Sequence, residues 1–455
     1  MQVARSAAGR ARVGLHRAAL AVLPYAKPLY SRLPLRLRLA LRDGLIRLGG
    51  PTPPASSTQA FLAALAATAR PGRAAEGVAL VGYPFGEFGL GESTRSMALG
   101  LASTGIALDV VDIGSLTRHR QDDRTIASLV TNRMGRRVNI LHVNCDALPD
   151  TMAALGRVHF EGRYTIVRPY WELDRIDPAW IAALSKVDEI WAPTRFVADV
   201  FRQAVDMPVT HVPVSIEIEA QPDGLRARLG LPEARHLFLF AFDFHSFPAR
   251  KNPEAAVAAF ERAFAGDRDA PVGLVVKVMG DNQRRAEAMG RLRDAAARDP
   301  RIHVVDAMLS RADQLALIAA CDSFVSLHRS EGFGYGPAEA MCLGKPVIAT
   351  DFSGTTDFVS ERTGYPVGYR LVPVAADEYP YVQPGSVWAD PDIDAAAAHM
   401  RAIVGDPAGA ARRGQAARAH MAANHGHAAV GRLMAARLQQ IEAAGSGGRR
   451  ARETT

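Results

Sequence analysis

The chain has 455 residues, enough for two or three domains of ordinary size. Hydrophobic residues make up 48% of it and charged residues 22%, which excludes wholesale disorder and allows a large packed core. The three cysteines, Cys145, Cys321 and Cys342, show no CxxC or other paired spacing. We therefore expect neither a disulfide framework nor a structural zinc site, and the chain fits a reducing compartment.

The net charge of +7 is concentrated at the N-terminus, because residues 1–50 hold ten basic residues and one acidic residue. The rest of the chain is close to neutral, so we expect no nucleic-acid partner. Leucines alternate with Arg36, Arg38 and Arg42 in this arm. Such a segment either lies on an anionic membrane surface or packs as a solvated arm on the protein itself.

The sequence predicts a cytoplasmic protein, peripheral at the inner face of the membrane if the arm binds lipid. No apolar run approaches the roughly 20 residues of a membrane-spanning helix. The best signal-peptide candidate, Ala18 to Ala26, is short and bordered by Arg17 and Lys27.

The arm is followed by a Pro/Ser linker at 51–58 and a short helix at 60–70. From Gly77 onward, strands and helices alternate. A first run has strands at 77–82, 106–111, 138–143, 164–168, 189–192 and 209–214. Its helices fall at 93–104, capped by Ser93 or Thr94, and at 151–155, 178–185 and 194–205.

A second run has strands at 236–244, 273–279, 302–305, 323–327 and 346–349. Its helices fall at 253–264, 284–298, 312–320, 336–343, 392–404 and 407–443, and the tail from Gly445 is predicted to be disordered. Two runs of β-α repeats predict an α/β protein with two doubly wound parallel sheets. The predicted parts are an N-terminal extension (1–75), two Rossmann-like domains (76–215 and 216–405), and C-terminal helices with the tail (406–455). A ligand is expected at the carboxyl ends of the strands, in a cleft between the domains.

The segment from Ser326 to Met341 has the strongest chemical pattern. Gly332, Gly334 and Gly336 allow a close approach of the backbone to a ligand, and Pro337 fits the first position of a helix. Free N–H groups at that helix start favour an anion. Two glutamates flank these glycines eight residues apart, Glu331 at the strand end and Glu339 in the first helical turn, and both are able to accept hydrogen bonds from sugar hydroxyls.

A second segment runs from Phe240 into a helix that starts at Pro253. Arg250 and Lys251 lie just before that helix, where they are well placed to neutralise a diphosphate. A solvated basic turn is an equal alternative for this segment taken alone. The chain has 54 basic residues, but its lysines are few: Lys27, Lys186, Lys251, Lys277 and Lys345. Because lysine and arginine are not interchangeable, each of these lysines is a candidate for a specific role.

These motifs together resemble a GT-B glycosyltransferase of the group 1 type, family 4. The resemblance rests on Glu331-x7-Glu339, on Arg250-Lys251-Asn252-Pro253 and on the two Rossmann-like halves, and it runs from about residue 77 to 401. It implies two domains that face a cleft. It also implies retaining transfer of a hexosyl or deoxyhexosyl group from a nucleoside-diphosphate sugar to a glycan. The basic arm fits a lipid-linked oligosaccharide acceptor, as in surface polysaccharide biosynthesis.

The resemblance also implies roles for individual residues. Arg250 and Lys251 bind the diphosphate, Glu331 contacts the donor sugar and Glu339 holds the ribose. Further donor-binding residues are expected to be Phe333 and Gly334, through their amides, and Tyr335, Ser246 and Lys277. No metal or cofactor is expected, because the nucleotide sugar is a substrate and the two cations and the helix start neutralise its diphosphate. Asp390 and Asp392 resemble a metal-binding Asp-x-Asp, but their place before a helix predicts a cap.

The N-terminal half is expected to hold the acceptor. Its loop from Tyr83 to Ser93 has glycines at 86, 89 and 91, which differs from the GxGxxG of a dinucleotide site. The loop resembles the acceptor-side glycine loop of the family, so Gly89, Gly91 and Glu92 are candidate acceptor contacts. Glu92 fits a helix-start carboxylate equally well.

Tyr170, Trp171 and Glu172 follow a strand end and suit either carbohydrate binding or core packing. Many relatives have a histidine near this point, and this chain has none there. The nearest candidates are His142, for which burial in the core is favoured, and Asn144. The residue that faces the anomeric carbon therefore stays open.

Other functions are compatible with this pattern. One is a nucleotide-sugar epimerase or a phosphorylase on the same scaffold. Another is a catalytically inactive scaffold protein that binds sugar nucleotides. A dinucleotide oxidoreductase is disfavoured by the glycine spacing.

Overall fold

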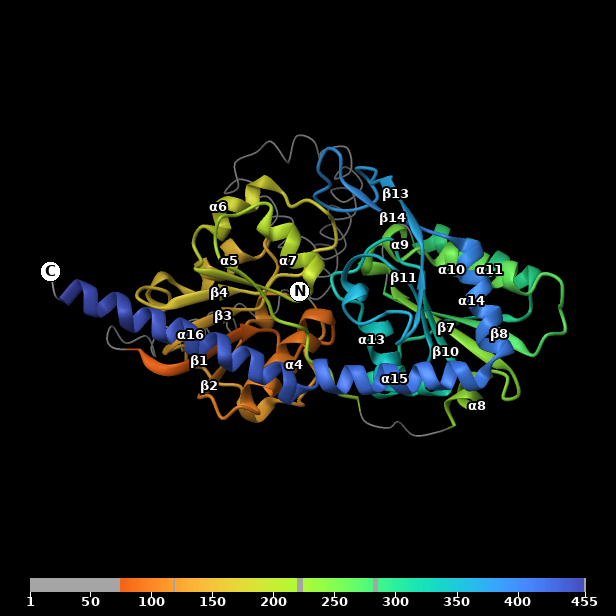
Figure 1. The fold of residues 1–455 in the computed structure, drawn as a ribbon, viewed down its shortest axis with the longest axis horizontal. Coiled ribbons are helices and arrows are strands. Elements are labelled where there is room, and N and C mark those ends of the chain that lie inside the picture. The colour runs from red at the N-terminus through yellow and green to blue at the C-terminus, as the bar shows by residue number, and fades with distance from the viewer. Residues whose placement is uncertain (1–73, 118, 219–223, 281–284, 454–455) are drawn as a thin grey trace, which may run out of the picture. The chain divides into compact units, whose positions relative to one another are not determined.

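The computed structural model describes residues 74–117, 119–218, 224–280 and 285–453, with side chains described up to residue 444. The predicted basic arm, linker and helix at 60–70 lie outside the described residues. Within these described ranges, the β structure consists of two six-stranded sheets and one two-stranded hairpin (Figure 1). Both sheets belong to one compact unit, Thr68–Gly114 and Arg118–Thr455, and of the other unit the structure describes Ser115–Thr117.

The first sheet has the strand order β2-β1-β3-β4-β5-β6, and every pair in it is parallel. Its strands are β1 (Ala75–Gly82), β2 (Leu108–Asp112), β3 (Arg136–Leu141), β4 (Tyr164–Val167), β5 (Glu189–Ala192) and β6 (Val209–His211). Its helices are α4 (Gly89–Ala102), α5 (Leu148–Leu155), α6 (Ile181–Leu184) and α7 (Arg195–Arg202).

The second sheet has the order β12-β11-β10-β7-β8-β9 and is also parallel throughout. Its strands are β7 (His236–Asp243), β8 (Val272–Met279), β9 (Ile302–Asp306), β10 (Ser323–Ser326), β11 (Val347–Thr350) and β12 (Tyr365–Val367). Its helices are α8 (Leu225–Leu229), α9 (Pro248–Lys251), α10 (Pro253–Ala263), α11 (Arg285–Arg298), α12 (Arg311–Ala320), α13 (Tyr335–Cys342) and α14 (Ile393–Gly405). The two predicted doubly wound sheets are therefore confirmed.

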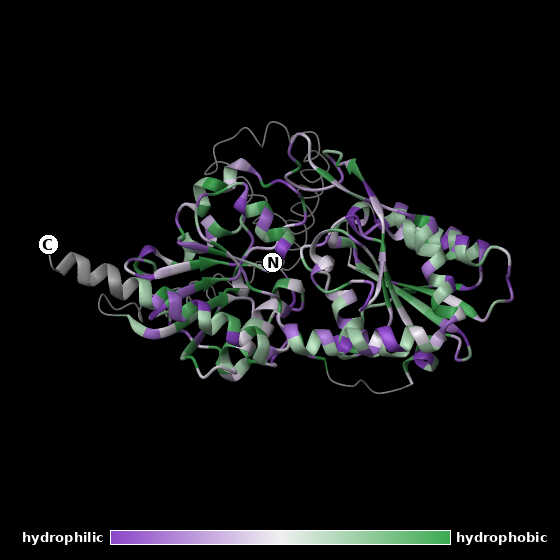
Figure 2. Ribbon diagram, in the orientation of Figure 1, coloured by the Kyte–Doolittle hydropathy of each residue, from purple (hydrophilic) through white to green (hydrophobic). Residues whose placement is uncertain are grey.

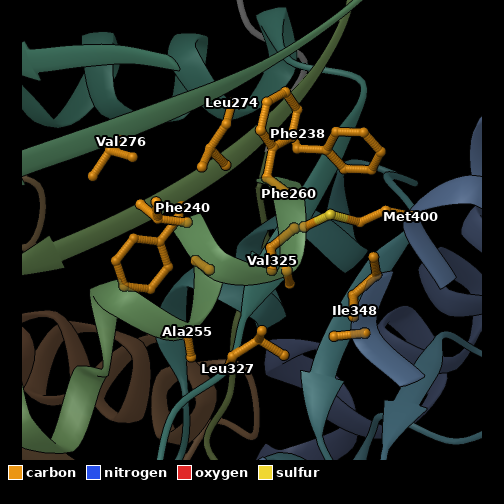
Figure 3. Close-up of a cluster of buried hydrophobic side chains, with 14 of the residues drawn as sticks. Phe238, Phe240, Ala255, Phe260, Leu274, Val276, Val325, Leu327, Ile348 and Met400 are labelled. Atoms are coloured by element: carbon orange, nitrogen blue, oxygen red, sulfur yellow. The ribbon is translucent and has the colours of Figure 1, made fainter. Parts of the chain in front are cut away.

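Apolar residues explain why these segments form buried parallel strands. Phe238 and Phe240 of β7 pack with Leu274 of β8, Phe260 of α10 and Met400 of α14 (Figure 3). Figure 2 shows hydrophobic residues concentrated on the strands of both sheets. Strands that are covered on both faces need such near-continuous apolar runs, because each face is removed from water.

The C-terminal helices divide their contacts between the two sheets. Ala417 and Met421 of α15 (Pro407–His425) join the core on the second sheet. Val430, Met434, Leu438 and Ile441 of α16 (His427–Glu453) join the core of the first sheet. Helix α16 lies against α4 (Figure 1), and a Cβ at Gly431 would come within 2.3 Å of the Gly100 carbonyl oxygen. This close approach of two backbones explains why both positions are glycine.

The structure corrects three details of the sequence prediction. Helix α4 begins at Gly89, not Ser93, so Ser93 and Thr94 lie inside the helix and do not cap it; the Thr94 hydroxyl instead donates to the Leu90 carbonyl at 2.8 Å and accepts from the Tyr83 N–H at 3.2 Å. Helix α13 begins at Tyr335, with Gly334 as its N-cap in the left-handed region, so Pro337 occupies its third position. Helix α16 continues past Gly445 to Glu453, where disorder was expected, because extending an existing helix adds one hydrogen bond per residue fixed.

An antiparallel hairpin was not predicted at all. It pairs β13 (Tyr369–Pro373) with β14 (Val387–Pro391), with Leu371 opposite Ala389. Most of β13 is exposed, so its sequence lacks the alternation of apolar and polar residues that marks a half-buried strand.

Candidate active site

Arg250, Lys251 and Glu331 meet at the carboxyl edge of the second sheet, where the strand order reverses between β7 and β10. After β7 the chain enters α9, which ends with Arg250 and Lys251. After β10 it passes through Glu331 to α13. Such a reversal is where ligands bind in open parallel sheets, because the loops leaving the two strands diverge.

The Glu331 carboxylate is held by two cations. Its Oε2 accepts a hydrogen bond from Arg250 Nη1 at 2.8 Å, and its Oε1 accepts one from Lys251 Nζ at 2.5 Å. Arg250 is 4% exposed and Glu331 is 6% exposed. Burial alone would raise the pKa of Glu331, but the charges of Arg250 and Lys251 outweigh it and hold that pKa well below its usual range. Arg250 and Glu331 are thus buried, Lys251 is half-buried, and the three side chains form an ion-paired cluster.

The backbone around the two cations is unusual. Phe247 has φ 62° and Asn252 has φ 58°, so two non-glycine residues adopt the left-handed region on either side of α9. Asn252 is among the side chains that tolerate this region, and its Nδ2 donates to the Leu327 carbonyl at 3.0 Å. Pro253 then begins α10. The Arg-Lys-Asn-Pro motif thus encodes a sharp turn that aims both cations at the loop after β10.

The three glycines of the loop after β10 each make room for a neighbour. A Cβ would lie 3.2 Å from Tyr170 at Gly332, 2.7 Å from Thr355 at Gly334 and 2.7 Å from Phe324 at Gly336. Gly334 also has φ +99°, which disfavours any larger residue. Glycine is therefore required at this helix start for packing.

Phe333 and Tyr335 flank Gly334 at the start of α13. The Phe333 side chain is buried against Phe358, so this residue has its backbone, not its ring, to offer a ligand. Tyr335 is half-buried beside it, with ring centroids 5.2 Å apart. The first N–H groups of α13 have no partner within the helix, as at any helix start.

Glu339 belongs to a second group of paired acidic and basic side chains, which the sequence did not reveal. Its Oε1 lies 2.6 Å from Arg311 Nη1, and Arg311 Nη2 lies 3.3 Å from Glu92 Oε1 of α4. Arg311 is the first residue of α12, behind the Ser310 cap. No motif marks it, and its two partners lie far away in sequence.

The glycine loop of the first sheet is held by Arg95. Its Nη1 donates to the carbonyls of Pro84 at 3.2 Å and Gly86 at 2.8 Å, and its Nη2 donates to Glu92 at 2.8 Å. A Cβ at Gly91 would lie 2.1 Å from the Gly86 oxygen, whereas Gly89 has no atom within 4 Å of such a Cβ. Gly91 therefore serves the packing of α4 on this loop.

Trp171 packs in the core rather than facing outward. Its ring contacts Trp180 edge-on with centroids 4.7 Å apart, and its indole N–H donates to the Arg175 carbonyl at 2.8 Å. Tyr170 OH lies 2.8 Å from Ser93 Oγ, and its backbone N–H donates to Asn144 Oδ1 at 3.0 Å. Of the two interpretations left open by the sequence, packing is the one observed for Trp171.

Glu172 reaches the buried cluster through Tyr379, which the sequence analysis missed. Tyr379 OH donates to Glu172 Oε2 at 2.8 Å, and the Arg250 guanidinium lies 5.8 Å from the centroid of its ring. Tyr379 comes from the loop between β13 and β14. Without a prediction of that hairpin, the sequence carried no signal for this contact.

His142 is fully buried, and its Nδ1 lies 3.1 Å from the Arg168 carbonyl oxygen. Burial, with a smaller contribution from the Arg168 charge, lowers its pKa to about 3. It is therefore a neutral core histidine, as the sequence interpretation favoured.

The last two donor-site candidates, Ser246 and Lys277, lie in different groups of residues. The Ser246 carbonyl accepts from Arg250 Nε at 3.3 Å, next to the Glu331 cluster. Lys277 belongs to a different group on the same sheet, because the charges that act on it come from Asp306, Asp243 and Arg285. Its Nζ donates to the Val278 carbonyl at 2.8 Å, and burial lowers its pKa to about 8.

Asp392 caps α14, as predicted, by accepting from the amides of Asp394 and Ala395. Asp390 instead pairs with Arg370 of β13 at 2.7 Å. Within the described ranges, no three histidine, cysteine or acidic side chains are grouped as metal ligands. Among the helices that the structure describes, none is long and apolar enough to cross a membrane.

Comparison with known proteins places this site in a recognised domain. Residues 236–378 match the family model described as Glycosyl transferases group 1. That region contains Arg250, Lys251, Glu331 and Glu339. No curated protein sequence matches the chain.

Solved structures identify the fold. HepE from Anabaena, in complex with UDP and glucose, is 14% identical, with a TM-score of 0.58 over 80% of this chain and 99% of that one. Sucrose-phosphate synthase from Thermosynechococcus elongatus is 19% identical, with a TM-score of 0.57 over 81% and 100% of the two chains. TarM from S. aureus is 12% identical, with a TM-score of 0.49, and this chain covers 54% of its length. The fold is GT-B, and together with the group 1 domain it supports a GT-B glycosyltransferase.

Proposed function

We propose that this protein transfers a hexosyl or deoxyhexosyl group from a nucleoside-diphosphate sugar to a glycan or lipid-linked oligosaccharide, with retention of configuration. The observation that carries the proposal is the Glu331 carboxylate held by Arg250 and Lys251 at the strand-order reversal, inside the region that matches group 1 glycosyltransferases. The crystal structure of HepE with UDP and glucose supports this class of donor.

In this proposal, Arg250, Lys251 and the start of α13 stabilise the charge that develops on the departing diphosphate. The bond between the anomeric carbon and the diphosphate oxygen breaks, and a bond to the acceptor hydroxyl oxygen forms on the same face. The acceptor proton passes to the departing diphosphate. The sugar nucleotide is consumed as a substrate, and we propose neither a metal nor a separate cofactor.

When the diphosphate binds Arg250 and Lys251, Glu331 would lose part of its ion pairing with them. It would accept hydrogen bonds from hydroxyls of the donor sugar instead. Such an exchange is electrostatically balanced, because the incoming diphosphate replaces one anionic partner of Arg250 and Lys251 with another. Phe333 and Gly334 would contribute backbone amides beside Glu331, and Tyr335, Ser246 and Lys277 would complete the donor site.

The acceptor would contact the first sheet through Gly89, Gly91, Glu92, Asn144, Tyr170 and Glu172. We keep Trp171 in this group through its backbone, since its ring is packed. The basic arm would bring the protein to an anionic membrane surface on the cytoplasmic side. Deleting residues 1–73 and measuring sedimentation with anionic vesicles tests this; unchanged sedimentation would contradict it.

The donor site is tested by thermal unfolding with UDP, GDP, dTDP, ADP and NAD, first without metal and then with magnesium. A ligand at about 100 times its Kd adds about 2.7 kcal/mol of stability. We expect a shift with one nucleoside diphosphate that is lost in Lys251→Ala and kept in Lys186→Ala, an exposed lysine. A shift with NAD alone, or with none of these ligands, would contradict the proposal.

A further inference from the structure

The family resemblance assigns Glu339 to the ribose of the donor, and we keep this role as part of the proposed function. The contacts of Glu339 raise the question of what holds its carboxylate ready for that role. The charged or titratable groups that face it are Arg311 of α12, Glu92 of α4 and Cys342 of α13. Glu339 is 6% exposed. A carboxylate in such a place tends to take up a proton, because burial disfavours its charged form.

The protonation state of Glu339 decides what it recognises. An ionised carboxylate is an acceptor only, whereas a protonated carboxyl donates through one oxygen. The two adjacent hydroxyls of a ribose present two donors, which match the two oxygens of an ionised carboxylate. Burial raises the pKa of Glu339, Arg311 opposes that rise, and Glu92 adds to it. Arg311 is therefore the group that favours the ribose-binding form.

Arg311 is itself oriented by the first sheet. Its Nη1 lies 2.6 Å from Glu339 Oε1, and its Nη2 lies 3.3 Å from Glu92 Oε1. Glu92 is fixed in turn by Arg95, which binds the carbonyls of the glycine loop. A planar guanidinium held between two carboxylates has little freedom to rotate. Arg311 therefore fixes the orientation of the Glu339 carboxylate.

We propose that Arg311 is a positioning residue for the nucleoside end of the donor site: it keeps Glu339 ionised and turned to accept both ribose hydroxyls, and Glu92 fixes Arg311 in place. This inference rests on the proposed function. It assigns Arg311 no contact with the diphosphate. A substitution of Arg311 should therefore weaken binding only of ligands that carry the ribose hydroxyls. This distinguishes it from a substitution that weakens the binding of every nucleoside diphosphate.

The test compares two ligands by calorimetry: the nucleoside diphosphate that the wild type binds, and the same compound with a 2′,3′-dideoxyribose. We expect Arg311→Met to weaken the ribose form at least 10-fold more than the dideoxy form. The loss should grow as the pH falls from 8 to 6, because Glu339 protonates at a higher pH without its cation. Equal weakening of both forms, or none, would overturn the proposal.

Two further variants keep the test decisive. Arg311→Lys retains the charge without the planar fork, so it should restore part of the ribose preference; no more affinity for the ribose form than in Arg311→Met would count against the proposal. In a Glu339→Gln background, Arg311→Met should add less than a twofold further loss, since the two residues act as one unit. Additive losses would show an independent role for Arg311.

Failure of this inference is distinguishable from failure of the proposed function. If the wild type binds no nucleoside diphosphate, both are overturned. If the wild type binds one and prefers its ribose form, but Arg311→Met leaves that preference unchanged, the function stands and the role of Arg311 does not.

Discussion

The Glu331 cluster makes the most direct prediction about single residues. Glu331→Gln replaces a carboxylate that pairs with Arg250 and Lys251 by an amide that cannot neutralise either. We expect turnover with the donor found by thermal unfolding to fall roughly 100-fold or more, a few kcal/mol of transition-state stabilisation.

The matched control is Glu361→Gln, which removes a carboxylate from an exposed turn. Its turnover should stay within about twofold of the wild type. Near-normal turnover in Glu331→Gln would mean that the reacting sugar lies elsewhere.

Lys277 predicts a pH dependence of stability. Its native pKa of about 8 lies below the ordinary value for lysine, so between pH 8 and about 10 the unfolded chain binds more protons than the native one. Stability contributed by this site therefore rises as the pH increases across that window. In urea unfolding, the wild type should gain stability relative to Lys277→Met from pH 8 to 10.

Lys186→Met provides the comparison, because Lys186 is exposed. The difference between the wild type and that variant should stay constant with pH. If the difference in the free energy of unfolding between the wild type and Lys277→Met is constant with pH as well, then burial does not disfavour the charged form of Lys277 in the native state.

At the scale of elements, the β13–β14 hairpin is tied to the first sheet through Tyr379. Its hydroxyl donates to the Glu172 carboxylate at 2.8 Å, and its ring is buried. Tyr379→Phe leaves the carboxylate without this donor, so we expect a loss of about 1–2 kcal/mol in the free energy of unfolding. Urea unfolding monitored by tryptophan fluorescence measures it, since Trp171 lies beside Tyr379.

Tyr369→Phe, on the exposed face of the same hairpin, removes a hydroxyl without this partner. Its stability should stay within about 0.5 kcal/mol of the wild type. Equal effects of the two substitutions would argue that the Tyr379–Glu172 contact contributes nothing in solution.

The elements also show where local sequence signals end. The sheets were predictable because runs such as Phe238–Phe242 and Val272–Val276 are apolar throughout. The start of α4 was not predictable, because its N-cap residue is Phe88, whose side chain makes no capping hydrogen bond. Ser93 and Thr94 looked like caps, yet their hydroxyls bind Tyr170 and Leu90.

The candidate site divides in the same way. Arg250, Lys251, Glu331 and Glu339 belong to motifs that a single sequence displays. Arg311 and Tyr379 do not, because their partners are distant: Arg311 meets Glu92 across 219 positions and Tyr379 meets Glu172 across 207. Contacts of that kind follow from the folded topology, which no local pattern encodes.

At the scale of the whole molecule, the C-terminal helix should be essential for stability. A chain that ends at His425 lacks Val430, Met434, Leu438 and Ile441 of α16. Burying four such side chains contributes about 6 kcal/mol or more, which is comparable with the entire stability of a typical domain. We expect this truncated chain to be cleaved rapidly within residues 74–211 by limited proteolysis.

A chain that ends at Ala444 keeps all four of these side chains and serves as the control. It should resist the protease as well as the full chain does. Resistance of the shorter chain would show that the first sheet is stable without α16.

The position of α16 also has a consequence for biosynthesis. The last strand of the first sheet, β6, ends at His211, but the helix that completes its core begins at His427. A ribosome adding about 5–20 residues per second needs roughly 10–40 s to make the intervening chain. During that time the nascent first sheet exposes apolar surface that its own sequence cannot cover. The half of the protein that is translated first is thus the half that finishes folding last, and a chaperone is most useful to it in that interval.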